Sequence, residues 1–194
     1  MHSPVKRIQV WLLASLAACA FTTRPAFADP IISIQPPVST PLVGSLFDVL
    51  VDVSSITDLF AYQFDISFDP AILSAVGTAE GGFLATGGST FFTPGSIDNT
   101  TGTVTFTSAS LVGALSGVTG SGTLATMTFS ALALGSSALD LSNVILLDSG
   151  LVDVPFTTTA GSVTTAAGTA VPEPVSLALL GLGLAGLGWS RRRK

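Results

Sequence analysis

The sequence predicts an all-β protein, folded as an antiparallel β-sandwich or jelly roll. Three observations carry this prediction. Apolar and polar residues alternate with a period of two in many short runs, and turn-forming residues separate these runs. No run has the periodicity of a long amphipathic helix. Many short strands without helical crossovers favour two packed antiparallel sheets.

Two runs show the alternation most clearly. In 46–53 one face of a strand carries Phe47, Val49, Val51 and Val53, and the other face carries Asp48 and Asp52. The next run places apolar side chains inward and small or polar ones outward. The inward residues are Tyr62, Phe64, Ile66 and Phe68, and the outward residues are Ala61, Gln63, Asp65 and Ser67. Both runs therefore predict half-buried strands.

Shorter apolar runs complete the predicted sheets. The further strands are expected at 31–34, 72–76, 91–92, 103–107, 124–130, 138–141, 144–147 and 161–164. Turns are expected at 98–102, 120–122 and 135–137, which are rich in Gly, Ser, Asn and Asp. The Ala- and Gly-rich segment 166–171 has too little apolar bulk to pack and is expected to be a linker.

The N-terminus has the organisation of a signal peptide, residues 1–28. Lys6 and Arg7 precede an apolar stretch, and Ala26 and Ala28 form the small-x-small pattern that signal peptidase accepts, so cleavage is expected after Ala28. Two alternatives stay open. The segment could be an uncleaved anchor, or Cys19 could be lipidated, because 16–19 resembles the lipobox of bacterial lipoproteins. All three interpretations imply export.

The remaining domain, 29–165, has an unusual charge distribution. Every Lys and Arg lies at positions 6, 7, 24 and 191–194, whereas all twelve acids lie between Asp29 and Glu173. The only His, the only Cys and both Trp are also outside the domain. These absences exclude His-, Cys- and Lys-based catalysis and the usual zinc, copper and non-haem iron ligands. A polyanion would be repelled, so no nucleic-acid partner is expected.

Carboxylate chemistry is all that this composition leaves. A glycosidase needs only two acids, but no acid lies in a recognisable catalytic motif, and the domain has one Tyr and no Trp for sugar stacking. We therefore predict that the protein is not an enzyme and assign no catalytic residues.

Two pairs of acids are candidate calcium ligands. Asp48 with Asp52, and Asp65 with Asp69, are four residues apart on strands and so share a face. Calcium binding together with backbone oxygens is one interpretation, and a solvated strand face is the simpler one. The simpler interpretation is preferred, so no metal ligand is assigned and calcium is the only cofactor considered.

The C-terminal segment 172–194 combines an apolar stretch, 175–189, with a cationic end. At about 1.5 Å per helical residue the stretch is shorter than a hydrocarbon core of roughly 30 Å, which favours a temporary membrane stop over a permanent anchor. Its motif residues are Pro172, Glu173, Pro174, Arg191, Arg192 and Arg193, followed by Lys194. In this order they resemble a PEP-CTERM sorting signal. That resemblance implies an exosortase partner that cuts near Pro-Glu-Pro after export.

A second resemblance covers roughly residues 31–165. Its blocks are Val43-Gly44, the run from Tyr62 to Pro70 with Leu73, Asn99 to Val104, Gly122 to Phe129 and Gly161 to Val163. Their order and spacing are similar to those of a cohesin domain. The resemblance implies a jelly-roll sandwich that binds calcium-loaded dockerin modules through one open sheet face. That face would include Ala61, Gln63, Asp65 and Ser67.

Together these features predict an exported, non-catalytic binding or scaffold module of the bacterial envelope, outer surface or extracellular matrix, transiently anchored in the inner membrane. The expected partner is an extracellular protein, a dockerin or another, bound through the sheet face. Direct binding of a polysaccharide is the alternative, because carbohydrate-binding modules share the cohesin fold. A carboxylate-based glycosidase is the third hypothesis.

Overall fold

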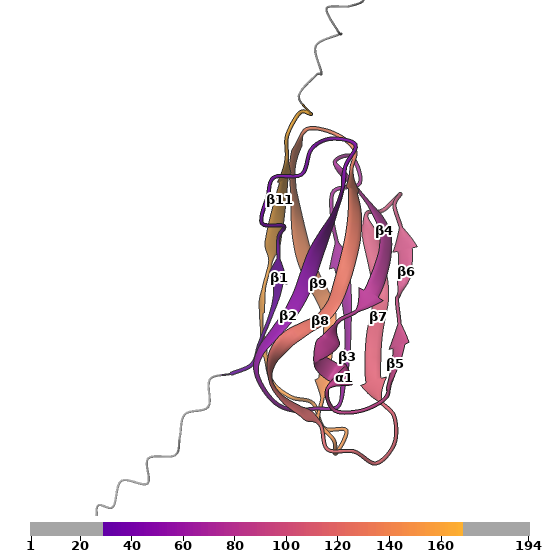
Figure 1. The fold of residues 1–194 in the computed structure, drawn as a ribbon, viewed down its shortest axis with the longest axis vertical. Helices are drawn as coiled ribbons and strands as arrows, with labels where there is room; N and C mark the ends of the chain where they lie inside the picture. The colour runs from indigo at the N-terminus through magenta and orange to yellow at the C-terminus, as the bar shows by residue number, and fades with distance from the viewer. Residues whose placement is uncertain (1–28, 169–194) are drawn as a thin grey trace, which may run out of the picture.

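A computed structural model describes residues 29–168, which form two β-sheets packed face to face (Figure 1). The predicted signal peptide, the sorting signal and the end of the predicted linker lie outside the described residues. Within 29–168, no helix has the length and apolar character needed to cross a membrane.

The first sheet has five strands in the order β10-β1-β2-β8-β4. Their bounds are β10 (Thr157–Thr159), β1 (Ile31–Gln35), β2 (Leu46–Leu59), β8 (Val118–Ala131) and β4 (Leu73–Glu80). The second sheet has six strands, in the order β11-β9-β3-β7-β5 with β6 also paired to β7. Their bounds are β11 (Gly161–Thr165), β9 (Gly135–Leu147), β3 (Ala61–Ser67), β7 (Thr103–Leu111), β5 (Thr90–Thr93) and β6 (Ser96–Asp98). Neighbouring strands are antiparallel except β1 and β10, which are parallel. The only described helix is the single turn α1 (Gly82–Ala85).

The core lies between the two sheets and follows the predicted alternation. In β3 every second residue is buried, and Phe64 is fully inaccessible to solvent. Phe129 of β8 stacks on Phe47 with ring centroids 6.0 Å apart and meets Phe68 edge-on at 5.2 Å. Burial of each large apolar side chain contributes about 1.5–3 kcal/mol, so these inward faces supply most of the driving force for folding.

The structure confirms the predicted β-sandwich and corrects several local predictions. The expected turn at 120–122 is wrong, because these residues lie inside β8. Gly122 serves close packing there, since a Cβ would come within 2.8 Å of the Phe83 ring. The expected turn at 135–137 is the first part of β9, and 138–141 and 144–147 belong to that one strand. The short strands β6 and β10 have three residues each and were not predicted.

The two ends of the described chain lie at opposite ends of the sandwich (Figure 1). At the C-terminal end, the Val43 amide donates to the Ala166 carbonyl and the Ala166 amide donates to the Pro41 carbonyl, both at 2.9 Å. Ordered contacts therefore extend through Ala166, one residue beyond β11.

Candidate partner-binding surface

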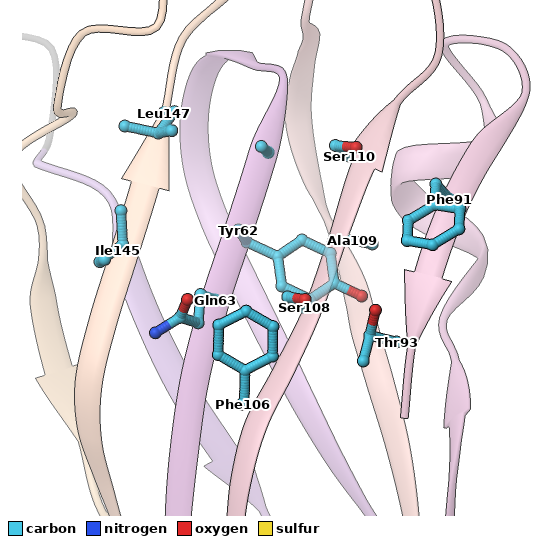
Figure 2. Close-up of a pocket in the computed structure, with 11 residues that line it drawn as sticks. Tyr62, Gln63, Phe91, Thr93, Phe106, Ser108, Ala109, Ser110, Ile145 and Leu147 are labelled. Atoms are coloured by element: carbon cyan, nitrogen blue, oxygen red, sulfur yellow. The ribbon is translucent and has the colours of Figure 1, made fainter. Parts of the chain in front are cut away.

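The outward face of the second sheet carries a shallow hollow of about 320 Å³. Four neighbouring strands, β9, β3, β7 and β5, supply its lining (Figure 2). The lining residues are Ala61, Tyr62, Gln63, Phe91, Thr93, Phe106, Ser108, Ala109, Ser110, Ile145 and Leu147. We call this surface the sheet face.

Large apolar side chains gather on the sheet face. Phe91 is 68% exposed, Phe106 55% and Ile145 40%, and Leu147 is half-buried beside them. Figure 2 shows the rings of Phe91 and Phe106 on different strands, with Ser108 and Thr93 between them. Isolated apolar residues are common on protein surfaces, but a contiguous group is typical of an interaction site.

A β-bulge in β7 turns Phe106 outward. Phe64 and Ile66 of β3 pair with Thr107 and Val104 of β7, so two residues of β7 lie opposite the single residue between them. In a regular strand, Val104 and Phe106 would share a face. With the bulge, Val104 and Thr107 are both buried, whereas Phe106 lies on the outer face with a φ of 61°. The bulge therefore adds an aromatic ring to the sheet face.

A second bulge, in β9 on the other side of β3, also turns apolar side chains outward. Gln63 pairs with Ile145 and Asp65 pairs with Ser142, so the strand carries one extra residue at this point. Asn143 there adopts a φ of 49°, in the left-handed region that Asn tolerates. Beyond the bulge Leu146 is buried, and Ile145 and Leu147 line the hollow.

The carboxylate of Asp65 holds both bulges. The Phe106 backbone amide donates to Asp65 Oδ1 at 2.7 Å, and Asn143 Nδ2 donates to Asp65 Oδ2 at 2.6 Å. Hydrogen bonds to an ionised acceptor are stronger than neutral ones, so this acid ties three strands together. Asp65 is therefore a positioning residue for the sheet face, and a direct contact of its carboxylate with a partner stays a prediction.

The other predicted face residues are half-buried on the same side of β3. Ala61 and Gln63 line the hollow. Ser67 pairs with Thr103 and Asp140 towards the far end of the strand and is not part of the lining. Of the four predicted residues, the structure thus brings two into the hollow and places Asp65 beside it.

Tyr62 anchors the sheet beneath the hollow. Its hydroxyl donates to the Leu124 carbonyl of β8 at 2.6 Å, which links the two sheets through the core. Burial, with a smaller contribution from the negative charge of Glu80, raises the pKa of Tyr62 far above its ordinary value. The phenol is therefore a permanent hydrogen-bond donor, and β3 is held rigidly against the opposite sheet.

The predicted acid pairs are engaged in local hydrogen bonds. Thr128 Oγ1 donates to Asp48 Oδ1 and Thr123 Oγ1 donates to Asp52 Oδ1, each at 2.7 Å, while Asp69 Oδ1 accepts the Ala71 amide at 2.9 Å. Between residues 29 and 168, no three His, Cys, Asp or Glu side chains gather closely enough to hold a metal ion. The calcium interpretation gains no support from this arrangement.

Two further acids stabilise loops. Ser149 Oγ donates to Asp58 Oδ2 at 2.7 Å and the Gly117 amide donates to Oδ1 at 2.6 Å, and these bonds lower the pKa of Asp58. The pKa of Asp98 is lowered by the amides and hydroxyl of the turn that follows it, chiefly the Thr100 amide at 2.8 Å. Both carboxylates favour the charged form because backbone and hydroxyl donors surround them.

Sequence reasoning missed the apolar members of the sheet face. Phe106 was not singled out because simple alternation places it on the same side as Val104. Ile145 and Leu147 were predicted only as part of the strand at 144–147, without an assigned face. The adjacent pair Phe91-Phe92 did contain a signal, because two consecutive strand residues point to opposite faces and one of them must face outward.

A β-sandwich whose open sheet presents an apolar, aromatic hollow is a protein of the binding-module class. The family model of the cohesin domain matches residues 33–165, and the chain therefore belongs to the cohesin domain family. Residues 170–193 match the PEP-CTERM protein-sorting motif. No curated protein matches the chain in sequence.

Solved cohesins share the fold. A non-cellulosomal cohesin from Archaeoglobus fulgidus is 15% identical, with a TM-score of 0.55, over 72% of this chain and 93% of that one. The sixth cohesin of scaffoldin B from Acetivibrio cellulolyticus, in complex with the Cel5 dockerin, is 19% identical, with a TM-score of 0.58 over 72% and 100%. The second type II cohesin module of the ScaA scaffoldin from the same organism is 16% identical, with a TM-score of 0.59 over 76% and 96%. At these identities the likeness shows the fold alone.

Proposed function

We propose that this protein is an exported, non-catalytic binding module that recognises a partner protein through the sheet face. The observation that carries the proposal is the group of Phe91, Phe106, Ile145 and Leu147 around one hollow. Two bulges direct the last three of these side chains outward. Aromatic and aliphatic anchors that insert into pockets typically supply most of the energy of a protein interface.

A dockerin, or another protein with an apolar surface, suits this face best. The Acetivibrio cellulolyticus cohesin named above was solved with a bound dockerin, and this chain belongs to the same domain family. The partner should also carry cations around its apolar residues, because the domain has acids and no Lys or Arg. Two copies of the domain would repel each other for the same reason.

The C-terminal sorting signal directs this module to the outside of the cell. The match at 170–193 supports recognition of the tail by an exosortase, with cleavage near Pro172-Glu173-Pro174 and release from a transient position in the inner membrane. The destination is the cell envelope, the outer surface or the extracellular matrix.

Binding of a polysaccharide is the second candidate function. Phe91 and Phe106 expose their rings on one face, and the hydroxyls of Thr93 and Ser108 lie between them (Figure 2). Sugar rings stack on aromatic faces and bond to such hydroxyls. A glycosidase activity has less support, because it needs two carboxylates and the lining of the hollow contains none.

Binding measurements with matched variants test the proposal. The purified protein is titrated against dockerin modules encoded in the source genome and, separately, against its matrix polysaccharides. Phe106→Ser should weaken binding to the protein partner by about tenfold or more, since an anchor residue contributes about 2 kcal/mol. Leu50→Ser, which changes an exposed residue of the first sheet, is the control and should leave binding unchanged.

The pattern of effects distinguishes the candidates. Equal weakening by both substitutions would refute the assignment of the sheet face. Binding to a polysaccharide alone, lost in Phe106→Ser, would favour the second candidate function.

A further inference from the structure

A second apolar surface lies at the end of the sandwich from which the chain continues towards the sorting signal. Its exposed residues come from the loop between β1 and β2, from the first residue of β2 and from the turn between β8 and β9 (Figure 1). We define the end patch as Leu42, Val43, Leu46, Leu132 and Leu134. We propose that the end patch rests on the lipid bilayer while the tail holds the unprocessed protein at the membrane.

Backbone contacts bring the segments of the end patch together around the C-terminal end of the described chain. Leu42 forms a β-bridge with Ala166, and Leu46 pairs with Ser130 at the end of β8. On the other side, the Thr165 hydroxyl donates to the Ala133 carbonyl at 2.6 Å, between Leu132 and Leu134. The end patch therefore surrounds the point at which the described chain ends.

Exposure and charge suit a lipid surface. Leu46 is 64% exposed, Leu134 61% and Leu132 51%, which is unusual for side chains of this size at one end of a domain. The three segments that form this end, 36–47, 130–139 and 161–168, contain no charged residue. Two acids border this end. Asp48 is exposed on β2 two residues after Leu46, and Asp69 lies in the loop between β3 and β4, whose Ile72 carbonyl accepts the Leu132 amide at 2.7 Å.

The opposite end of the molecule differs in charge, although Leu151 and Val152 are exposed there as well. Asp58 lies there near the end of β2, Asp148 and Asp153 lie in the segment after β9, and Asp58 accepts hydrogen bonds from Ser149 and Gly117. An acidic far end and an uncharged apolar near end would give the domain a preferred orientation on a bilayer, because charge is kept in water.

The length of the connecting chain brings the end patch to the membrane. Only 169–174 separate the described domain from the apolar stretch 175–189. At about 3.3 Å per residue, even a fully extended connection spans about 20 Å. Membrane insertion of the tail would thus hold the end patch close to the headgroups, where tethering makes even weak contacts effective. This inference rests on the membrane-held precursor of the proposed function.

Site-specific quenching in vesicles tests the contact. The chain from residue 29 to 194, as left by the predicted signal cleavage, contains no cysteine, so a single introduced cysteine can be labelled with an environment-sensitive fluorophore. The labelled chain is reconstituted into phosphatidylcholine vesicles whose acyl chains are brominated. A probe at Leu132→Cys should be quenched strongly. A probe at Leu151→Cys, which is 65% exposed on the loop between β9 and β10, is the control and should be quenched little.

A second pair of variants measures the contribution of the leucines. With the probe at Leu46→Cys, adding Leu132→Asn and Leu134→Asn should lower the ratio of contacting to non-contacting domains about tenfold, since two half-exposed leucine side chains no longer leave water. Both leucines are exposed, so circular dichroism should show an intact fold.

Each outcome decides the matter. The lipid contact of the end patch alone would be overturned by either of two results in vesicle-bound protein. The first is equal quenching of the Leu132 and Leu151 probes, and the second is quenching that the asparagine variants leave unchanged. A chain that fails to float with vesicles would overturn both the end patch and the membrane-held precursor. Shielding of the Leu132 probe only in vesicles that contain the processing enzyme would overturn the lipid contact in favour of a protein contact.

Discussion

Replacing Asp65 with Ala should disorganise the sheet face from beneath. The substitution removes two hydrogen bonds to a carboxylate, from the Phe106 amide at 2.7 Å and from Asn143 Nδ2 at 2.6 Å. Such bonds contribute about 1.5–3 kcal/mol each, towards the lower value here because water can reach both donors. Relief of the left-handed conformations of Phe106 and Asn143 returns part of this energy. The net loss in free energy of unfolding should be about 2 kcal/mol.

Denaturant unfolding of the processed domain and partner binding measured in parallel provide the assay. Asp65→Ala should lower the unfolding midpoint with an unchanged slope and weaken binding, because Phe106 is no longer fixed on the outer face. Asp65→Asn should lose about half as much stability, since both bonds can be remade as neutral ones if the Asn143 amide flips. Asp140→Ala removes the same charge from an exposed position of β9 and is the control.

The reasoning would be refuted by a specific result. If Asp65→Ala and Asp140→Ala had the same stability, the carboxylate would not hold the bulges. If Asp65→Ala lost stability but bound the partner with unchanged affinity, the bulges would be unrelated to recognition.

Four further predictions follow from the same structure. Phe64→Asp should unfold the domain, because it places a charge at a fully buried position. Gln63→Ala, on the outer face, should change the free energy of unfolding by less than about 0.5 kcal/mol. Thermal melts compare the two variants, and a stable Phe64→Asp protein would contradict the assigned strand. The pKa of Asp58 in the folded domain is lowered from 3.8, so the ionised carboxylate should stabilise the fold above pH 3.8 and lose this effect as the pH falls below that value. The difference in Tm between the parent and Asp58→Asn should therefore shrink at low pH. A difference in Tm that stays constant with pH would contradict the stabilising role of the Asp58 carboxylate. Added salt or calcium should raise the Tm of the isolated domain by screening acids that have no cation to pair with, and a Tm independent of salt would remove that argument. Intact mass of protein from the source cell should show a chain that begins near Asp29 and ends near 172–174, whereas a retained cationic tail would contradict processing.

Strands with one buried and one exposed face could be predicted from the sequence. In β2 as far as Val53 and throughout β3 the side-chain period of two is uninterrupted, so Phe64 and its neighbours could be assigned to the inner face. Beyond Val53 the period in β2 breaks, and the buried Ile56 and Leu59 were not predicted. The predictions failed where distant residues decide the local conformation. Gly122 looked like a turn residue, but its role is to admit the ring of Phe83.

The candidate site depends even more on contacts between residues that are distant in the chain. Ala61 and Gln63 were predicted because the resemblance to a cohesin domain implied a binding face on this strand and the regular alternation of β3 showed which residues face outward; both line the hollow. The outward positions of Phe106, Ile145 and Leu147 depend on bulges held by Asp65 through donors 41 and 78 positions away in the chain. A period counted along one strand carries no information about such contacts, so Phe106 was assigned no role.

The separation of charge along the chain also determines which proteases can cut it. Between Arg24 and Arg191 the sequence has no Lys or Arg. A protease whose specificity pocket carries a carboxylate, as in trypsin, requires one of these side chains beside the scissile bond. Such an enzyme can trim the two ends but finds no bond to cleave in the domain. Folding normally protects a domain only while it stays folded, whereas this resistance comes from composition and persists even in the unfolded chain.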